Sequence, residues 1–265
     1  MTGLSDSFHR PINYLRISVT DRCNLRCVYC MPAEGVSLMS HNDILRYEEI
    51  YTVARAAAEL GIEKIRLTGG EPLVRSGLTQ LIQMLAQIEG IDDISLTTNG
   101  VLLGRYAAEL KSAGLRRVNV SLDTLKPDRF ELITRRGNSL DGVLAGIEVA
   151  RSVGLNPVKI NVVVMSGVND DELLDFAAKT INEEWHVRFI ELMPFVGGGI
   201  TPRFISASEM RQRLEQLGEL EPCLPTAGNG PAKYFRFPQA RGTIGFITPI
   251  SEHFCFDCNR IRLTA

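Results

Sequence analysis

The sequence lacks any apolar run of the roughly 18 residues that a membrane-spanning helix needs. It also lacks the short apolar stretch near its start that marks a secretory signal peptide. Its 29 Lys and Arg residues nearly balance 31 Asp and Glu residues, and the net charge of −2 gives no general attraction to nucleic acid or to a membrane surface. We therefore expect a cytoplasmic protein that binds neither nucleic acid nor membrane.

Histidine, the side chain most often used in acid–base catalysis, is also scarce. The chain has 4 His residues, none with a recognisable catalytic partner, and it shows no Ser/His/Asp constellation. We therefore expect no catalytic side chain, and we expect bound cofactors to carry the difficult chemistry.

The 6 cysteines are distributed unevenly along the chain. They form a group of three, a pair and one isolated residue: Cys23, Cys27 and Cys30; Cys255 and Cys258; and Cys223. Cytosolic thiols stay reduced, so clustered cysteines in such a chain indicate metal or redox chemistry and not disulfides. Cys223 lies between Pro222 and Pro225, and we expect it to take no part in a metal site.

The group of three cysteines is one ligand short of a closed tetrahedral metal site. A zinc ion would need a fourth ligand nearby, but His41 lies eleven residues after Cys30 and His9 lies upstream. An iron–sulfur cluster held by three cysteines leaves one iron with an open position, as a catalytic zinc site does. The spacing, directly after a first predicted strand, favours this cluster, with zinc or unligated thiols as the alternative.

Short apolar stretches alternate with amphipathic helical segments over most of the chain. The predicted strands span residues 14–20, 64–69, 93–99, 117–123, 158–165 and 187–193. Helical patterns lie between most of them, for example over residues 46–61 and 105–114, each ended by a glycine. A strand–helix unit repeated about six times predicts an α/β fold of parallel strands with right-handed crossovers.

Polar residues recur at every second position of these strands, which places them on one face of the sheet. The polar series comprises Arg16, Ser18 and Thr20; Arg66 and Thr68; Ser95, Thr97 and Asn99; Asn119, Ser121 and Asp123; Lys159 and Asn161; and Glu191 and Met193. The opposite face is apolar, as at Ile17, Ile65 and Val118, and suits packing against helices. A polar face on parallel strands predicts a curved, barrel-like sheet whose wet lumen can hold a polar ligand.

The pattern changes near residue 195. Residues 195–202 are rich in Gly and Pro and predict a linker, residues 206–218 predict a capped helix, and residues 234–249 predict a pair of strands. We therefore expect two domains, a barrel over residues 1–195 and a smaller, incomplete region over residues 196–265.

Several segments carry a resemblance to a known family. CNLRCVYC at residues 23–30 resembles the signature of the radical S-adenosylmethionine (SAM) superfamily, and TGGEP at residues 68–72 supports it. The ordered segments RISVTDRCNLRCVYCMP, RLTGGEPLVR, LTTNG, VSLDTL, KINVVVM, IELMPF and FCFDCNRIRLTA resemble the GTP 3′,8-cyclase family of molybdenum cofactor biosynthesis. This resemblance implies a partial (β/α)6 TIM-like radical SAM barrel with a smaller C-terminal α+β appendage.

The resemblance also implies a reaction. In that family one [4Fe–4S] cluster binds SAM at its open iron, and a second three-cysteine [4Fe–4S] cluster binds the guanine of GTP. The reduced first cluster would cleave SAM to a 5′-deoxyadenosyl radical, which abstracts the ribose 3′-hydrogen of GTP. Attack of the carbon radical on C8 of guanine, followed by one-electron reduction and protonation of the resulting radical, would give (8S)-3′,8-cyclo-7,8-dihydroguanosine 5′-triphosphate. The enzyme class that the resemblance implies is a lyase.

The implied partners are GTP, an external electron donor and the cyclic pyranopterin monophosphate synthase that receives the product, and a homodimer remains possible. Carried onto matching positions, the first cluster would be bound by Cys23, Cys27 and Cys30, and the second by Cys255 and Cys258. SAM would contact Tyr29, Gly70, Ser121 and Met193. GTP would contact Arg16, Arg66, Thr97, Lys159, Arg260, Ile261 and Arg262. The residues agree with this assignment, because cations on separate strands that face one lumen suit a triphosphate.

The family pattern continues beyond the last residue of this sequence. The third ligand of the second cluster and a glycine-rich tail would both follow Ala265, so we expect the natural protein to be longer and this chain alone to be inactive. Two alternatives remain: another radical SAM enzyme with an auxiliary cluster, such as a peptide-modifying maturase, or a non-catalytic metal-binding scaffold. A maturase would have no need of Arg16 and Lys159 around a triphosphate.

Overall fold

The computed structural model of the chain describes residues 3–7, 9–137, 139–193, 203–228, 230–252 and 258–264. The strands are β1 (Tyr14–Ser18), β2 (Lys64–Thr68), β3 (Asp93–Thr98), β4 (Arg117–Ser121), β5 (Lys159–Val164), β6 (His186–Glu191), β7 (Glu221–Pro222), β8 (Lys233–Arg236), β9 (Thr243–Ile247) and β10 (Arg260–Leu263). The α-helices are α1 (Tyr47–Glu59), α2 (Leu78–Ala86), α3 (Leu103–Ser112), α4 (Pro127–Thr134), α5 (Leu140–Ser152), α6 (Leu173–Asn182) and α7 (Ala207–Leu214). Short 3₁₀ helices are η1 (His41–Asp43), η2 (Pro72–Val74), η3 (Asp170–Glu172) and η4 (Glu215–Leu217).

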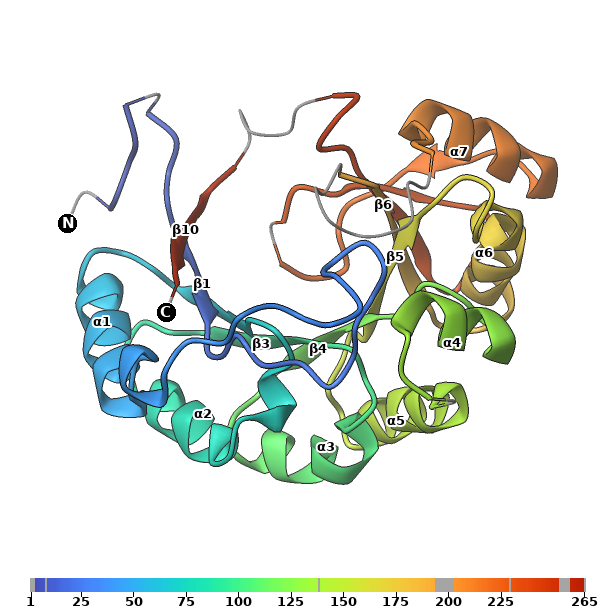
Figure 1. Cartoon of the computed structure of the whole chain (residues 1–265). Helices are drawn as coiled ribbons and strands as arrows, with labels where there is room; N and C mark the ends of the chain where they lie inside the picture. The colour runs from blue at the N-terminus through green and yellow to red at the C-terminus, as the bar shows by residue number, and fades with distance from the viewer. Residues whose placement is uncertain are drawn as a thin grey trace.

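Within the described residues, the strands form a ten-stranded sheet in the order β10-β1-β2-β3-β4-β5-β6-β9-β8-β7. Strands β1 to β6 pair in parallel and in chain order. Helices α1 to α6 form an arc along the outer side of this curved sheet (Figure 1). The predicted α/β fold, an open barrel of six parallel strands with crossover helices, is confirmed.

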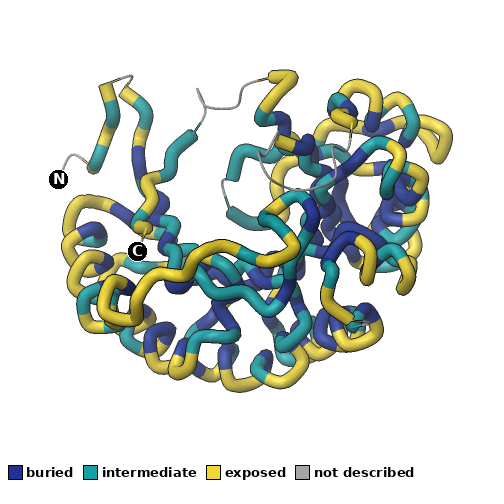
Figure 2. The backbone as a smooth tube through the Cα atoms, viewed as in Figure 1, coloured by how far each residue is buried: buried dark blue, intermediate teal, exposed yellow. Residues whose placement is uncertain are grey.

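The core lies between the sheet and the helices. The outward residues of the strands, among them Ile17, Ile65 and Val118, are 0% exposed and belong to the main hydrophobic cluster. Exposed residues lie mainly on the loops and on the outer sides of the helices (Figure 2). This division follows the period-2 pattern of the strands, in which alternate residues point to opposite faces. No helix among the described residues is long and apolar enough to cross a membrane.

The C-terminal strands extend the barrel sheet at both of its edges. Strand β9 pairs in parallel with β6, β8 and β7 follow it in antiparallel order, and β10 returns across the molecule to pair in parallel with β1. The helix predicted over residues 206–218 corresponds to α7 and η4, and the predicted strand pair corresponds to β8 and β9. The linker predicted over residues 195–202 and the domain boundary at 195 lie outside the described residues.

The register of β6 corrects one expectation. Arg188 pairs with Asn161, which fixes the series of β6 that faces the lumen as His186, Arg188 and Ile190. Glu191 belongs to the opposite series, so its predicted place on the lumen face is wrong. Its carboxylate accepts hydrogen bonds from the backbone N–H groups of Ala207, Ile250 and Ser251. A shift of one residue reverses the face because side chains alternate along a strand.

The entry into β9 provides a test of the packing. A Cβ on Gly242 would lie 1.7 Å from the carbonyl oxygen of Trp185, so we expect Gly242→Ala to lower the free energy of unfolding by about 2–4 kcal/mol. Gly142, exposed in α5, has no atom within 4 Å of its built Cβ, and Gly142→Ala should raise stability by about 0.5–1 kcal/mol. Urea denaturation of both variants checks this, and equal midpoints would contradict it.

Candidate functional site

The first group of cysteines lies on the segment that follows β1, at the carboxyl end of that strand. The carbonyl oxygen of Cys27 accepts hydrogen bonds from the N–H of Cys30 at 2.9 Å and of Met31 at 3.2 Å, which makes a tight turn. The N–H of Leu25 donates to the Sγ of Cys23 at 3.4 Å. Hydrogen bonds to ligand sulfurs are one means by which a protein sets the potential of an iron–sulfur cluster.

The thiols of this group face a common, partly buried space. Burial, together with the charges of Asp123 and Cys23, raises the pKa of Cys30 to about 11. Burial also raises the pKa of Cys23 and of Cys27, the latter with contributions from Asp123 and the other two thiols. Thiols that perturb one another in this way can serve a shared group, but they must lose their protons to do so.

The three cysteines supply the thiolate donors of an iron–sulfur cluster. Among the described residues, no group of three Cys, His, Asp or Glu side chains could hold one metal ion. A cubane iron–sulfur cluster binds each thiolate through a different iron, so its ligands stand further apart than those of a single ion. The donor set of Cys23, Cys27 and Cys30 therefore suits a [4Fe–4S] cluster with one open iron.

The GGEP turn follows β2 and packs directly on the backbone that precedes the first cysteine. The N–H of Gly70 donates to the carbonyl of Thr20 at 2.7 Å, and that of Glu71 donates to the carbonyl of Arg22 at 2.8 Å. A Cβ on Gly70 would lie 2.3 Å from the oxygen of Arg22, and one on Gly69 would lie 2.3 Å from the oxygen of Thr20. Only glycine allows this close approach of two backbones.

Glu71 ties the turn to the neighbouring strand and to the cysteine segment. Its carboxylate is 1% exposed and accepts hydrogen bonds from the N–H of Leu73 at 3.0 Å, the hydroxyl of Thr98 at 2.8 Å and the N–H of Asn99 at 2.6 Å. The amide of Asn99 in turn donates to the side-chain oxygen of Asn24 at 2.8 Å. A buried carboxylate with three donors holds the turn, the end of β3 and Asn99 in fixed positions relative to one another.

Tyr29 is held by a second buried carboxylate. Its hydroxyl donates to Asp123 at 2.7 Å, and the other oxygen of Asp123 accepts from the N–H of Val163 at 2.8 Å. Burial raises the pKa of Asp123 to about 6. The aromatic ring next to the cysteines therefore has a fixed orientation.

The residues expected to contact SAM all lie near the carboxyl ends of strands. Tyr29 and Gly70 follow β1 and β2, and Ser121 is the last residue of β4. Met193 lies two residues beyond β6 and is 58% exposed. Barrel folds place their ligands at this edge of the sheet, but the roles of these four residues stay predictions.

The lumen behind this edge carries a series of cations on neighbouring strands. Arg16 pairs in register with Arg262 on one side and with Arg66 on the other. Burial lowers the pKa of Arg16, and the charges of Arg262 and Arg260 lower it further. Burial likewise lowers the pKa of Arg66 to about 10.

Lys159 shows the strongest effect of this crowding. It is 2% exposed, and burial together with the charges of Arg188, Arg117 and Arg66 lowers its pKa to about 6. Its ammonium group donates to the carbonyl of Ala227 at 2.5 Å. Such a pKa favours the neutral amine of Lys159 at pH 7.

Two lumen cations were missed by the sequence reasoning, Arg117 and Arg188, each 4% exposed. Arg117 forms an ion pair with Asp93. Arg188 donates to the side-chain oxygen of Asn119 at 2.5 Å, and its buried Nε has no partner among the described residues. Arg117 shares the alternation of Asn119 and could have been found from it, whereas Arg188 needed the correct register of β6.

The other residues expected to contact GTP lie on β3 and β10. Thr97 pairs with Asn119 across β3 and β4. Arg260 and Arg262 belong to the same alternate series of β10, and Ile261 between them is 39% exposed. A cavity of about 260 Å³ brings Arg16 and Arg262 together with Gly70, a residue expected to contact SAM.

Of the second cysteine pair, Cys258 lies within the described residues. Burial raises the pKa of Cys258, but hydrogen bonds from Arg260 outweigh this and leave it below its usual value. Cys255 lies outside the described residues. Cys223 is half-buried, with its N–H bonded to the carbonyl of Tyr234 at 3.0 Å.

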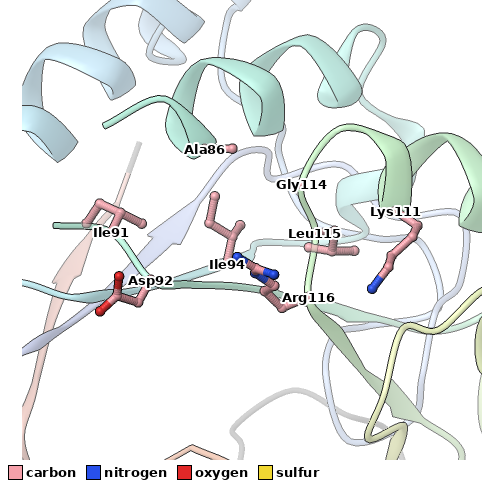
Figure 3. Close-up of a pocket in the computed structure, with 8 residues that line it drawn as sticks. All are labelled: Ala86, Ile91, Asp92, Ile94, Lys111, Gly114, Leu115 and Arg116. Atoms are coloured by element: carbon pink, nitrogen blue, oxygen red, sulfur yellow. The ribbon is translucent and has the colours of Figure 1, made fainter. Parts of the chain in front are cut away.

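A further cavity, of about 190 Å³, lies at the opposite end of the strands, where β3 and β4 begin (Figure 3). It is lined by Ile94, Lys111 and Arg116 among others, and Lys111 donates to the carbonyl of Gly154 at 2.7 Å. None of the predicted site residues lines it. The amino-terminal end of a barrel serves stability more often than chemistry.

Comparison with known proteins agrees with this site. The family model of the radical SAM superfamily matches residues 17–179, which include the cysteine segment and the GGEP turn. The family model for Molybdenum Cofactor Synthesis C matches residues 185–265. The fold and the site thus define a radical SAM barrel followed by a C-terminal region of molybdenum cofactor synthesis.

The chain is 57% identical to the GTP 3′,8-cyclase of Moorella thermoacetica over 263 residues, which cover 99% of this chain and 81% of that protein. It is also 57% identical to the GTP 3′,8-cyclase of Pelotomaculum thermopropionicum, with 99% and 81% covered. The GTP 3′,8-cyclase of Peptoclostridium acidaminophilum is 54% identical, with 99% and 80% covered. The chain therefore belongs to the GTP 3′,8-cyclase family of radical SAM enzymes.

Solved structures agree at the level of the fold. SuiB of Streptococcus suis bound to S-adenosylmethionine aligns with a TM-score of 0.64 at 17% identity, over 78% of this chain and 46% of that protein. Methylornithine synthase aligns with a TM-score of 0.59 at 18% identity, over 77% of this chain and 62% of that protein. Both likenesses support the TIM-like radical SAM barrel.

The GGEP turn provides a test of the site. Gly70→Ala would push its Cβ into the carbonyl of Arg22 and displace the backbone before the cysteines. After anaerobic iron–sulfur reconstitution, we expect the variant to bind SAM at least about tenfold more weakly than the parent, as measured by equilibrium dialysis. Gly142→Ala, outside the site, serves as the control. Unchanged SAM affinity in the Gly70 variant would show that the turn does not hold SAM.

Proposed function

We propose that this chain carries the SAM site and the GTP lumen of an enzyme for the radical SAM cyclisation of GTP to (8S)-3′,8-cyclo-7,8-dihydroguanosine 5′-triphosphate, the first step of molybdenum cofactor biosynthesis. The observation that carries the proposal is the lumen, where cations on separate strands lie behind a three-cysteine segment. Identity of 57% to two GTP 3′,8-cyclases supports the same reaction. When bound, the iron–sulfur cluster and SAM supply a 5′-deoxyadenosyl radical, and the residues of this chain supply binding and orientation.

The first cluster would be held by Cys23, Cys27 and Cys30, next to the GGEP turn. Tyr29, Gly70, Ser121 and Met193 are the residues proposed to hold SAM. The support is their common location at the carboxyl ends of β1, β2, β4 and β6. The buried carboxylates of Glu71 and Asp123 would keep the turn and the tyrosine ring in place through the hydrogen bonds described above.

GTP would lie in the lumen with its triphosphate among the cations. The residues proposed to bind it are Arg16, Arg66, Thr97, Lys159, Arg260, Ile261 and Arg262. Arginine presents fixed donor pairs to phosphate oxygens, and a lumen with little water strengthens each contact. Such preorganised charges orient the ribose toward SAM without rearrangement during the reaction.

The remaining assignments of the sequence analysis stay proposals. Cys255 and Cys258 would bind a second [4Fe–4S] cluster near the guanine, with a third ligand from elsewhere. An external electron donor would reduce the first cluster, and the product would pass to cyclic pyranopterin monophosphate synthase. The homodimer, the cytoplasmic location and the two domains, 1–195 and 196–265, rest on the sequence alone.

Anaerobic reconstitution of a full-length version of the protein with iron and sulfide, followed by GTP, SAM and dithionite, tests the function. We expect brown protein, formation of 5′-deoxyadenosine and loss of GTP with the 3′,8-cyclised product. Formation of 5′-deoxyadenosine without consumption of GTP would indicate another radical SAM enzyme. Colourless protein that contains zinc and forms no 5′-deoxyadenosine would indicate a metal-binding scaffold.

Lys159 makes GTP binding dependent on pH. Its pKa near 6 in the empty lumen should rise when a triphosphate lies beside it, so binding takes up a proton. Above pH 7.5 the phosphate groups, with a pKa of about 6, are already ionised. Between pH 7.5 and 9 we expect affinity to fall by up to about tenfold per pH unit.

Isothermal titration calorimetry with GTP over this pH range measures the effect. The matched variant Lys159→Met removes the ammonium group and keeps the apolar stem, so it should bind GTP more weakly and lose the pH dependence. If Lys159→Met bound GTP as tightly as the parent, the assignment of this lysine to the triphosphate would be wrong.

A further inference from the structure

Two tyrosines meet the lumen cations at the amino-terminal end of the strands. Tyr14 is the first residue of β1, and Tyr234 lies on β8 beside β9. We propose that these tyrosines are specificity-determining residues that bind the terminal phosphoryl group of the triphosphate and so distinguish it from a diphosphate. This inference rests on the proposed function and names the part of the site that selects the length of the phosphate chain.

Ala227 and Gly228, which precede β8, contact lumen cations at the amino-terminal end of the strands, and we call these two residues the floor of the lumen. The carbonyl of Ala227 accepts the ammonium group of Lys159 at 2.5 Å. Gly228 packs on the guanidinium group of Arg117, which lies 3.0 Å from a Cβ built on that glycine. A phosphate chain that enters from the carboxyl ends of the strands therefore meets a floor, and the position of its last group is defined there.

Tyr14 lies within electrostatic reach of the same cations, because the buried Arg188 interacts with both Tyr14 and Tyr234. The residue is 2% exposed, and its buried hydroxyl has no hydrogen-bond partner among the described residues. The guanidinium carbon of Arg66 lies 5.3 Å from the centre of its ring. A buried hydroxyl without a partner lowers stability, and an anionic oxygen beside Arg66 would supply the missing acceptor.

The phenol hydrogen of Tyr234 is also available for a hydrogen bond to a phosphate oxygen. Its oxygen accepts from the ammonium group of Lys159 at 3.2 Å, and it also hydrogen-bonds with the buried Arg188. The ammonium nitrogen lies 5.1 Å from the centre of the same ring. When a bound anion favours the ammonium form of Lys159, both Lys159 and Arg188 donate to this oxygen, and the phenol proton is left to bond a phosphate oxygen.

The excess of buried positive charge at this end of the lumen favours the binding of an anion. The guanidinium groups of Arg66, Arg117 and Arg188 surround the tyrosines, together with Lys159, whose amine gains a proton more readily when an anion lies beside it. The carboxylate that pairs with them is Asp93, and it is bound to Arg117. The rest of the positive charge is buried without a counterion from the described residues. Arg16, Arg260 and Arg262 form a separate cationic group nearer the cavity of about 260 Å³.

A triphosphate is long enough to contact the cations around the tyrosines and also the group of Arg16, Arg260 and Arg262. A diphosphate lacks the terminal phosphoryl group that would lie beside the tyrosines. The contribution of the two hydroxyls should therefore appear with three phosphates and largely vanish with two. Inorganic tripolyphosphate and pyrophosphate test this without the nucleoside and without either cluster.

The experiment compares Tyr14→Phe with the parent, using calorimetric titration and thermal unfolding. Tyr14→Phe should bind tripolyphosphate about tenfold more weakly and change pyrophosphate affinity by less than about threefold. Without ligand it should unfold at the same temperature as the parent or higher, because the substitution removes an unpaired hydroxyl. Tyr234→Phe should show the same selective loss, and Tyr51→Phe on the outer helix α1 should show none.

With reconstituted enzyme, the ratio of kcat/KM for GTP to that for GDP should fall in the Tyr14 variant. Equal weakening of tripolyphosphate and pyrophosphate, or no weakening of either, would overturn the inference. So would a lower unfolding temperature of the empty variant without a selective loss of tripolyphosphate. A parent protein that binds no tripolyphosphate would overturn the GTP site proposed above and this inference with it, whereas GTP turnover with unselective variants would overturn this inference alone.

Discussion

The parallel register of the strands is the constraint on which the site depends. Arg262, Arg16 and Arg66 stand at matching positions of β10, β1 and β2, so their side chains enter the lumen at one level. A slip of one residue in any strand would turn its cation toward the helices. The outward residues prevent this slip, because Ile17 and Ile65 are 0% exposed and have no other place to pack. The apolar core thus determines where the charges lie.

The buried cations of the lumen lower the stability of the fold and favour the binding of a polyanion. Burying a cation without a partner carries a penalty, and a lysine can reduce that penalty by releasing its proton, as the pKa of Lys159 near 6 indicates. An arginine cannot readily do so, and Arg188 is supported by the neutral groups of Asn119 and Tyr234. A polyanion in the lumen would offset this penalty, and the charges would need no rearrangement to bind it.

The sequence was sufficient for features that depend on local pattern. Period-2 alternation located the six barrel strands and the faces of five of them, and the spacing of Cys23, Cys27 and Cys30 indicated a cluster with an open iron. The face of β6 was misassigned because Glu191, which bonds the backbone of distant segments, resembles a lumen residue in a short strand. The roles of Tyr14 and Tyr234 were not visible at all, since they arise where β1 and β8, distant in sequence, meet the same cations.

The two parts of the chain supply different parts of the site. The cysteine segment and the GGEP turn lie within residues 17–179, the part that matches the radical SAM superfamily as a whole. Arg188, Tyr234, Arg260 and Arg262 lie within residues 185–265, the part that matches the molybdenum cofactor region. Since β9 and β10 add to opposite edges of the six-stranded sheet, this second part lines the lumen from both sides. A shared barrel can thus keep its cofactor site while the flanking strands determine which polyanion fills the lumen, because strands that pair in register with β1 and β6 present their side chains to the same space.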